Sequence, residues 1–273
     1  MNHRIVLIVA VVAIAAACVF AQASGSAAKA SGSIPRAADG HPDLSGIWQF
    51  AIDLPPTGLK KTGPSGVEFK TVDQSGRRAA KGVPGALPST NAPSYKPELQ
   101  AKVKDLIDHE SRTDPVFYCG RPGVPRIGSP RKIVQTPKEM IFFYEDISGD
   151  PYRIIPVDGR AHRKDANPTY YGDSVGRWEG DTLVVDVTNF NEDGWFGEEG
   201  YFHSDAMHVV ERLWRDGANL VYQYTVDDPK VLTAPWIAPP RVVKPSNEPL
   251  EESPKCVETD AAKLVNNDHH GQR

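Results

Sequence analysis

The sequence is poor in cysteine and has no excess of basic charge. It contains three Cys, and 31 Lys plus Arg stand against 35 Asp plus Glu, which gives a net charge of -4. A chain without a basic excess lacks the field that binding to a phosphate backbone needs, so we expect no nucleic-acid partner. The composition, with 40% hydrophobic and 8% aromatic residues, excludes full disorder, collagen, coiled coils and polytopic membrane proteins.

Residues that interrupt regular structure are abundant. The chain has 23 Gly and 24 Pro, and so many breakers favour short strands and loops over long helices. We therefore expect a β-rich domain.

The N-terminus has the pattern of a signal peptide. Met1 to Arg4 form a short basic start, Ile5 to Phe20 carry no charge, and Ala21-Gln22-Ala23 fits the cleavage rule, which predicts a mature chain from Ser24 and a periplasmic or secreted location. A retained membrane anchor is the alternative, although the run is short for the roughly 20 residues of a span. Lipidation of Cys18 is a second alternative.

Removal of the signal leaves Cys119 and Cys256 as an even pair. In an oxidising compartment such a pair is expected to form a disulfide. Two metal thiolates are the alternative, but neither Cys lies in a CxxC motif or at a ligand spacing from a His.

Composition divides the mature chain into segments. Residues 24–43 are predicted to be a flexible tether, and residues 44–260 a single domain that starts with a strand at 44–50. Residues 54–97 form a Gly/Pro-rich loop excursion, and residues 97–112 a helix with apolar residues at helical spacing. A Pro-rich segment follows residue 229, and residues 261–273 are predicted to be a frayed tail.

After Cys119 the apolar residues alternate with polar ones, and turn signals follow at short intervals. The pattern predicts four hairpins: 132–146, 152–157 with 160 onward through Asp158-Gly159, 175–178 with 182–188, and 207–215 with 219–226. An open sheet of about eight strands would leave exposed edges, so closure is favoured. We predict a mainly β fold, an antiparallel lipocalin-like (calycin-like) barrel with one helix and long Gly/Pro-rich wrapping loops.

Several motifs resemble those of a known family. The stretch GRWEGDTLVVD at 176–186 resembles a hallmark of a large family of uncharacterised secreted bacterial proteins, and 42–48, 122–126, 158–162 and 211–212 also resemble that family's motifs. The resemblance implies no activity. Gly46-Ile47-Trp48 is similar to the G-x-W of lipocalins, where the Trp closes the base of the barrel, and this implies an architectural relation only.

One motif suggests a serine nucleophile. Gly172-Asp173-Ser174-Val175-Gly176 matches G-x-S-x-G, which requires a strand before the turn and a helix after it. Neither flank fits, because a hairpin follows, so a glycine-bounded loop is the favoured interpretation.

Charged residues on predicted strands are the better candidates for chemistry. Asp158, Arg160 and His162 alternate along an extended chain and would point the same way. His162 would then be a general acid or base, Asp158 its orienting partner, and Arg153 or Arg160 the stabiliser of negative charge. Glu145, Asp186 and His203 are second choices. The alternative is a solvent-exposed face with a bend at Asp158-Gly159.

Histidine spacing and aromatic residues bear on two further kinds of site. His203 and His208 are five residues apart, a spacing that does not favour a metal site, and we predict neither metal nor cofactor. Aromatic residues in a Gly/Glu-rich loop and on the nearby strands would line the mouth of a barrel and bind an apolar ligand. They are Trp178, Trp195, Phe196, Tyr201, Tyr144 and Trp214.

These patterns lead to three hypotheses for function. The leading one is a secreted, cofactor-independent enzyme, a lyase, isomerase or hydrolase that acts on a small, partly apolar or aromatic molecule by acid/base catalysis. The second is a lipocalin-like binding or carrier protein, and the third is a structural envelope protein. The sequence gives no oligomeric state.

Overall fold

The computed structural model describes residues 34–49, 60–62, 66–68, 82–90, 92–146, 148–197, 200–253 and 255–256. Internal contacts separate Met1–Ser31 from Gly32–Arg273, and all described residues belong to the second unit. The predicted signal peptide, Cys18 and the predicted tail lie outside the described residues. None of the described helices has the length and apolar character needed to cross a bilayer.

The first sheet has four antiparallel strands in the order β1-β4-β5-β6. Its strands are β1 (Gly46–Ile47), β4 (Lys132–Gln135), β5 (Glu139–Phe143) and β6 (Tyr152–Pro156). The first predicted hairpin, β4 with β5, is confirmed. The second is wrong: β6 pairs back with β5, and no strand follows the Asp158-Gly159 bend among the described residues up to β7.

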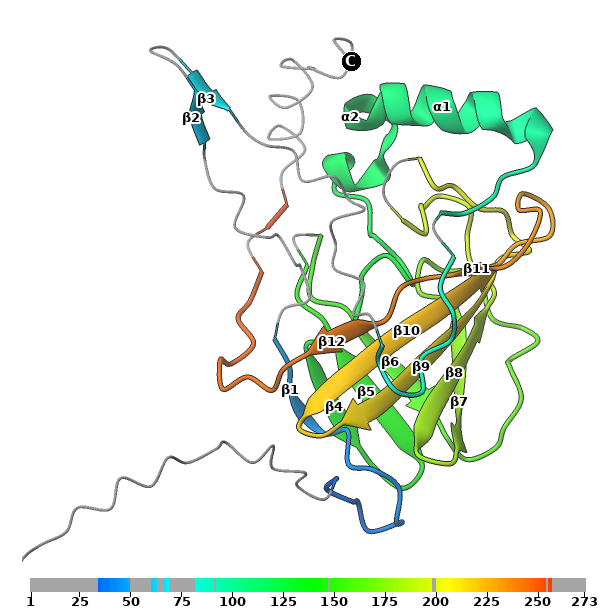
Figure 1. Cartoon of the computed structure of the whole chain (residues 1–273). Coiled ribbons are helices and arrows are strands. Elements are labelled where there is room, and N and C mark those ends of the chain that lie inside the picture. Colours follow the sequence, from blue (N-terminus) through cyan, green and yellow to red (C-terminus); the bar gives the residue numbers. More distant parts are fainter. Residues whose placement is uncertain are drawn as a thin grey trace, which may run out of the picture. The chain divides into compact units, whose positions relative to one another are not determined.

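The second sheet has six antiparallel strands in the order β11-β10-β9-β8-β7, with β12 also paired to β10. Its strands are β7 (Asp173–Glu179), β8 (Thr182–Thr188), β9 (His208–Asp216), β10 (Asn219–Asp227), β11 (Trp236–Ile237) and β12 (Arg241–Val243). The third and fourth predicted hairpins are confirmed. Figure 1 shows β7 to β10 side by side.

Both confirmed hairpins of this sheet turn at a glycine with positive φ, Gly180 at 60° and Gly217 at 59°. Glycine adopts this conformation without the steric cost that a Cβ brings, which is why it favours tight hairpin turns.

The predicted helix over 97–112 is present in three pieces. A 3₁₀ turn η2 (Pro97–Leu99) leads into α1 (Gln100–Asp108), and α2 (Glu110–Thr113) follows His109. Leu99, Val103 and Leu106 pack against the core, which accounts for the apolar spacing seen in the sequence. A further 3₁₀ turn, η3 (Pro115–Tyr118), ends at Cys119.

Two small features lie in segments predicted to be irregular. Within the loop excursion, β2 (Lys60–Thr62) pairs with β3 (Gly66–Glu68) as a separate hairpin. At the end of the predicted tether, the Arg36 guanidinium binds the Asp181 carboxylate at 2.9 Å, and the His41 ring stacks on Trp178 with centroids 4.6 Å apart. The described end of the tether therefore contacts the turn between β7 and β8.

The core lies between the inner faces of the two sheets. Ile133, Phe142 and Ile155 from the first sheet and Leu183, Val209 and Leu213 from the second are at most 1% exposed. Backbone hydrogen bonds also tie β1 to the segment after β12, because Gln49 N–H donates to Lys244 O and Ser246 N–H to Ile47 O, both at 2.8 Å. No ladder joins β6 to β7 among the described strands, so two sheets are formed and no closed barrel is found.

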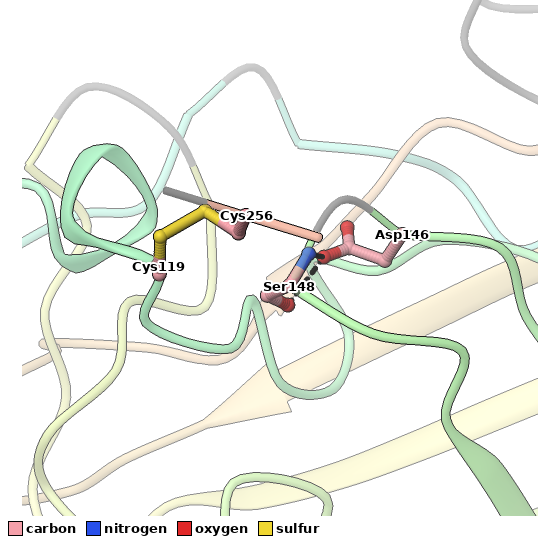
Figure 2. The surroundings of a disulfide bond; sticks show 4 residues. All are labelled: Cys119, Asp146, Ser148 and Cys256. Carbon is pink, nitrogen blue, oxygen red and sulfur yellow. Dashed lines mark hydrogen bonds between the residues drawn. A yellow bond between two sulfur atoms is a disulfide. The ribbon is translucent and has the colours of Figure 1, made fainter. Parts of the chain in front are cut away.

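The predicted disulfide is present. Cys119 and Cys256 are bonded, with their Cα atoms 5.7 Å apart, and Figure 2 shows them beside the loop that holds Asp146 and Ser148. A disulfide is typical of proteins outside the reducing cytosol, so the pair is consistent with an extracytoplasmic protein.

Candidate functional site: a carboxylate–imidazole cluster

The strands of the second sheet place charged groups on its outer face. On β8, Leu183, Val185 and Val187 point into the core, so Asp186 points outward. On β9, Val209 and Leu213 point inward, so His208 is also on the outer face. Asp186 lies opposite Val210 in the ladder, which puts His208 diagonally next to it.

His162 reaches the same face from the loop after β6. Its Nδ1 lies 3.0 Å from Asp173 Oδ2 at the start of β7, and its Nε2 lies 2.9 Å from Asp186 Oδ1. The second oxygen of Asp186 lies 3.0 Å from His208 Nε2. One carboxylate therefore joins two imidazoles.

Arg163 extends the cluster at its Asp173 end. The Arg163 Nε donates to Asp173 Oδ1 at 2.7 Å, and its backbone N–H donates to Asp173 Oδ2 at 3.1 Å. The Asp173 side chain is 4% exposed, whereas that of Arg163 is 57% exposed. The guanidinium thus adds an accessible positive charge to the cluster.

Hydrogen bonding in the cluster lowers the pKa of both carboxyl groups. Burial acts to raise the pKa of Asp186, but the hydrogen bonds from His162 and His208 outweigh it, so this pKa lies below its ordinary value of 3.8. At Asp173 burial again opposes the shift, and hydrogen bonds from Arg163 and His162 lower the pKa. Both groups are carboxylates at neutral pH.

The two imidazoles differ in what they can do. Both nitrogens of His162 are engaged, because one lies within hydrogen-bond distance of an Asp173 oxygen and the other of an Asp186 oxygen. His208 gives Nε2 to Asp186, and its Nδ1 makes no hydrogen bond with another described residue. The His208 side chain is 40% exposed. His208 can therefore exchange a proton with a bound molecule, and His162 holds Asp186 in place.

The predicted partners of His162 are elsewhere. Asp158 and Arg160 are exposed at the bend, where Asp158 Oδ1 accepts from Arg160 N–H at 3.2 Å. Gly159 has φ of 84°, so the extended alternation that would have aligned the three residues is broken. The carboxylates that orient His162 are Asp173 and Asp186, and Asp158 is not one of them.

Arg153 lies in the core, on the inner face of β6. Its Nη1 and Nη2 bind the two oxygens of Glu211 on β9 at 3.1 and 2.6 Å, and they also bind the hydroxyls of Tyr144 and Ser174. Tyr222 donates to Glu211 Oε1 at 2.9 Å. The Arg153 and Glu211 side chains are 4% and 0% exposed. This pair joins the two sheets, and Arg153 does not meet the His162 cluster.

Ser174 and Tyr144 belong to that buried network. Ser174 lies in β7 and accepts from Arg153, so the G-x-S-x-G segment forms strand without the turn and helix that a nucleophile needs. Burial strongly raises the pKa of Tyr144, which keeps its hydroxyl protonated.

The two remaining candidates have separate surroundings. Glu145 accepts from Arg131 Nε at 2.7 Å, and from Glu251 N–H. His203 is 7% exposed, its Nδ1 lies 3.0 Å from Ser204 O, and burial lowers its pKa. Within the described part of the chain, no group of three or more His, Cys, Asp or Glu is arranged to hold a metal ion.

The predicted mouth of aromatic residues is packed interior. Trp195 is 6% and Phe196 0% exposed, and the rings of Phe196 and Tyr201 stack with centroids 5.7 Å apart. Gly200 in this loop lies against α1: a Cβ there would be 2.9 Å from Leu106 Cβ. Trp214 is 7% exposed because the segment around Pro84 covers it. Among these aromatics only Trp178 and Tyr201 are partly exposed, and Trp178 is stacked on His41.

A pocket of about 360 Å³ lies beside α1, and Tyr95 in its lining is in ring contact with Phe196 and Tyr201. It is lined by Pro93, Ser94, Tyr95, Gln100, Val103, Lys104 and Ile107.

Sequence reasoning missed Asp173, His208 and Arg163 as members of the cluster. The available signal was strand alternation, which places Asp186 and His208 on the polar faces of two strands. Their contact depends on the pairing of β8 with β9, and that register is not contained in either strand alone.

Comparisons with known proteins give no further assignment. No family model matches the chain, and neither the curated proteins nor the solved structures contain a significant match. The resemblance of 176–186 to a secreted bacterial family stays a prediction.

Proposed function

We propose that the chain is a periplasmic or secreted enzyme that acts by acid/base catalysis through its own side chains. His208 is the catalytic base or acid, and Asp186 is the positioning residue that fixes its ring. The observation that carries the proposal is the Asp186 carboxylate, whose two oxygens lie 2.9 and 3.0 Å from the two imidazoles. His162, which bridges Asp173 and Asp186, helps to hold the Asp186 carboxylate in place.

The geometry favours other roles for these residues than the sequence suggested. His162 has both nitrogens engaged with carboxylates, so neither nitrogen is open to a bound molecule. Arg163 replaces Arg153 and Arg160 as the cation that binds an anionic or carbonyl oxygen of the substrate. The reaction class remains lyase, isomerase or hydrolase, on a small, partly apolar or aromatic molecule.

The buried network is the reason for preferring an enzyme to a carrier. A lipocalin-like barrel would hold its ligand inside, but Arg153, Glu211 and Tyr222 occupy the space between the sheets and are at most 5% exposed. An interior filled by a paired ion and its hydrogen-bond partners leaves no surface for an apolar ligand.

Turnover of a panel of small phenolic and ester compounds tests the proposal. His208→Gln removes the free ring nitrogen and should lower the rate by about 10²-fold or more. The matched control is His109→Gln, because His109 on the surface next to α1 also faces an aspartate, with Nδ1 3.3 Å from Asp105 Oδ1. Turnover that survives His208→Gln, or falls equally in both variants, would contradict the assignment.

A further inference from the structure

The outer face of the four-stranded sheet is apolar. Directly paired residues of an antiparallel sheet point to the same side, so the ladder defines this face. Ile141 pairs with Ile154 and with Val134, and Phe143 pairs with Tyr152. The other face of the same strands carries the buried Met140, Phe142 and Ile155. We call Val134, Ile141, Phe143, Tyr152 and Ile154 the outer apolar face.

With the described residues in place, two members of this face are largely exposed and the other three are half-buried. Tyr152 is 62% and Ile154 is 50% exposed, the two largest exposures among the large hydrophobic residues that stand out on the described surface. The Phe143 and Tyr152 rings contact one another with centroids 6.4 Å apart. A contiguous apolar face of this kind on a sheet marks an interaction surface, whereas single exposed apolar residues do not.

Opposite charges stand at the two ends of the outer apolar face. Lys132 pairs with Phe143 at one end, and Glu139 pairs with Pro156 at the other. Neither charged side chain makes an ion pair or hydrogen bond with another described residue. A two-fold axis that lies between two such faces, across the strands, places Lys132 of each copy over Glu139 of the other. The face is therefore complementary to itself, as an isologous contact requires.

We propose that the outer apolar face binds a second copy of the chain, sheet against sheet with antiparallel strands, to form a symmetric dimer. Tyr152 and Ile154 are its apolar anchors, and the Lys132–Glu139 pairs set the orientation. The face lies on the opposite sheet from the His208 cluster, so the dimer and the proposed function stand or fall separately.

Sedimentation velocity of the purified chain over a concentration series tests the proposal. The expected result is a monomer–dimer equilibrium that Ile154→Asp weakens by at least about tenfold. Val242→Asp is the control, because Val242 is exposed to 37% on β12, outside the face. Circular dichroism melts of each variant separate lost association from lost folding.

Charge reversal tests the orientation. Lys132→Glu and Glu139→Lys should each weaken the dimer by about five- to tenfold, and the double reversal should restore it. A chain that stays monomeric up to about 1 mM, a dimer that Ile154→Asp leaves intact, or a double reversal weaker than either single one would overturn the proposal. If the chain is a monomer that sediments with phosphatidylglycerol vesicles, and Ile154→Asp abolishes this binding, the dimer proposal would be overturned and the face would be a membrane-binding surface.

Discussion

At the scale of the residue, Asp186 is the group on which the candidate site depends. It is part of β8, which is held on both sides by β7 and β9, and its two oxygens meet different rings. A rigid strand fixes a carboxylate more precisely than a loop does, and that precision is what an orienting group supplies to an imidazole.

Acidification should destabilise the protein through Asp173 and Asp186. Both carboxyl groups have a folded-state pKa below the ordinary value of 3.8. Their contribution to the stability of the fold is therefore fully present above that value and is lost as pH falls through the folded-state pKa. We expect the melting temperature of Asp186→Asn to fall less than that of the wild type between about pH 4 and pH 2, a window that starts at the ordinary carboxyl pKa of 3.8 and extends below it. If the melting temperatures of the two proteins fell equally with pH, the result would contradict the lowered pKa of Asp186.

Single residues of the site were predictable only in part. The sequence indicated His162 through its alternation with Asp158 and Arg160, and it indicated Asp186 because a charged residue that interrupts an apolar strand is conspicuous. It assigned the wrong orienting partner to His162, because Asp158 is close along the chain and the true partners lie 11 and 24 residues away. Contacts over such separations arise from strand pairing, which local spacing does not encode.

At the scale of the element, turn chemistry predicted three hairpins correctly and one wrongly. Gly180 and Gly217 each stand between two apolar alternating runs, so both strands of the hairpin have a face to bury. Gly159 provides the same local turn signal, but Arg160, Arg163 and Lys164 follow it, and such a segment has no apolar face to pair with β6. A turn forms a hairpin only where both arms can be buried.

The two sheets are joined by the buried pair of Arg153 on β6 and Glu211 on β9. Glu211→Leu alone leaves the guanidinium buried without its charge partner, and we expect it to lower the free energy of unfolding by about 3 to 5 kcal/mol in urea titrations. The double variant Arg153→Met/Glu211→Leu should lose much less, because it leaves no unpaired charge in the core.

A matched exposed pair provides the control for this prediction. Arg36 and Asp181 also form a bidentate contact, but their side chains are 48% and 54% exposed. Asp181→Ala should change stability little, because solvent screens the pair. If Arg153→Met/Glu211→Leu were as unstable as Glu211→Leu, the pair would contribute more to the free energy of unfolding than the neutralisation of a buried charge.

At the scale of the whole molecule, the disulfide ties the segment after the helices to the C-terminal segment, across 137 residues of sequence. Constraining so long a loop in the unfolded chain stabilises the fold by roughly 4 to 5 kcal/mol in the chain-entropy model. Cys119→Ser/Cys256→Ser should melt at a clearly lower temperature than the wild type. Reductant should lower the wild-type melting temperature toward that of the variant and leave the variant unchanged. Equal melting of both oxidised proteins would contradict this account.

In the described part of the chain the space between the sheets is filled, and the His208 cluster lies on the outer face of the second sheet, where we propose that the chemistry takes place. The central claim is that Asp186 binds one nitrogen of His208 and leaves the other free. The imidazole tautomer reports this directly, through long-range ¹H–¹⁵N NMR of the histidine rings at about pH 8, above the usual histidine range. The account predicts a proton on Nε2 of His208 in the wild type and a mixture of tautomers in Asp186→Ala. A proton on Nδ1, or the same mixture in both proteins, would contradict it.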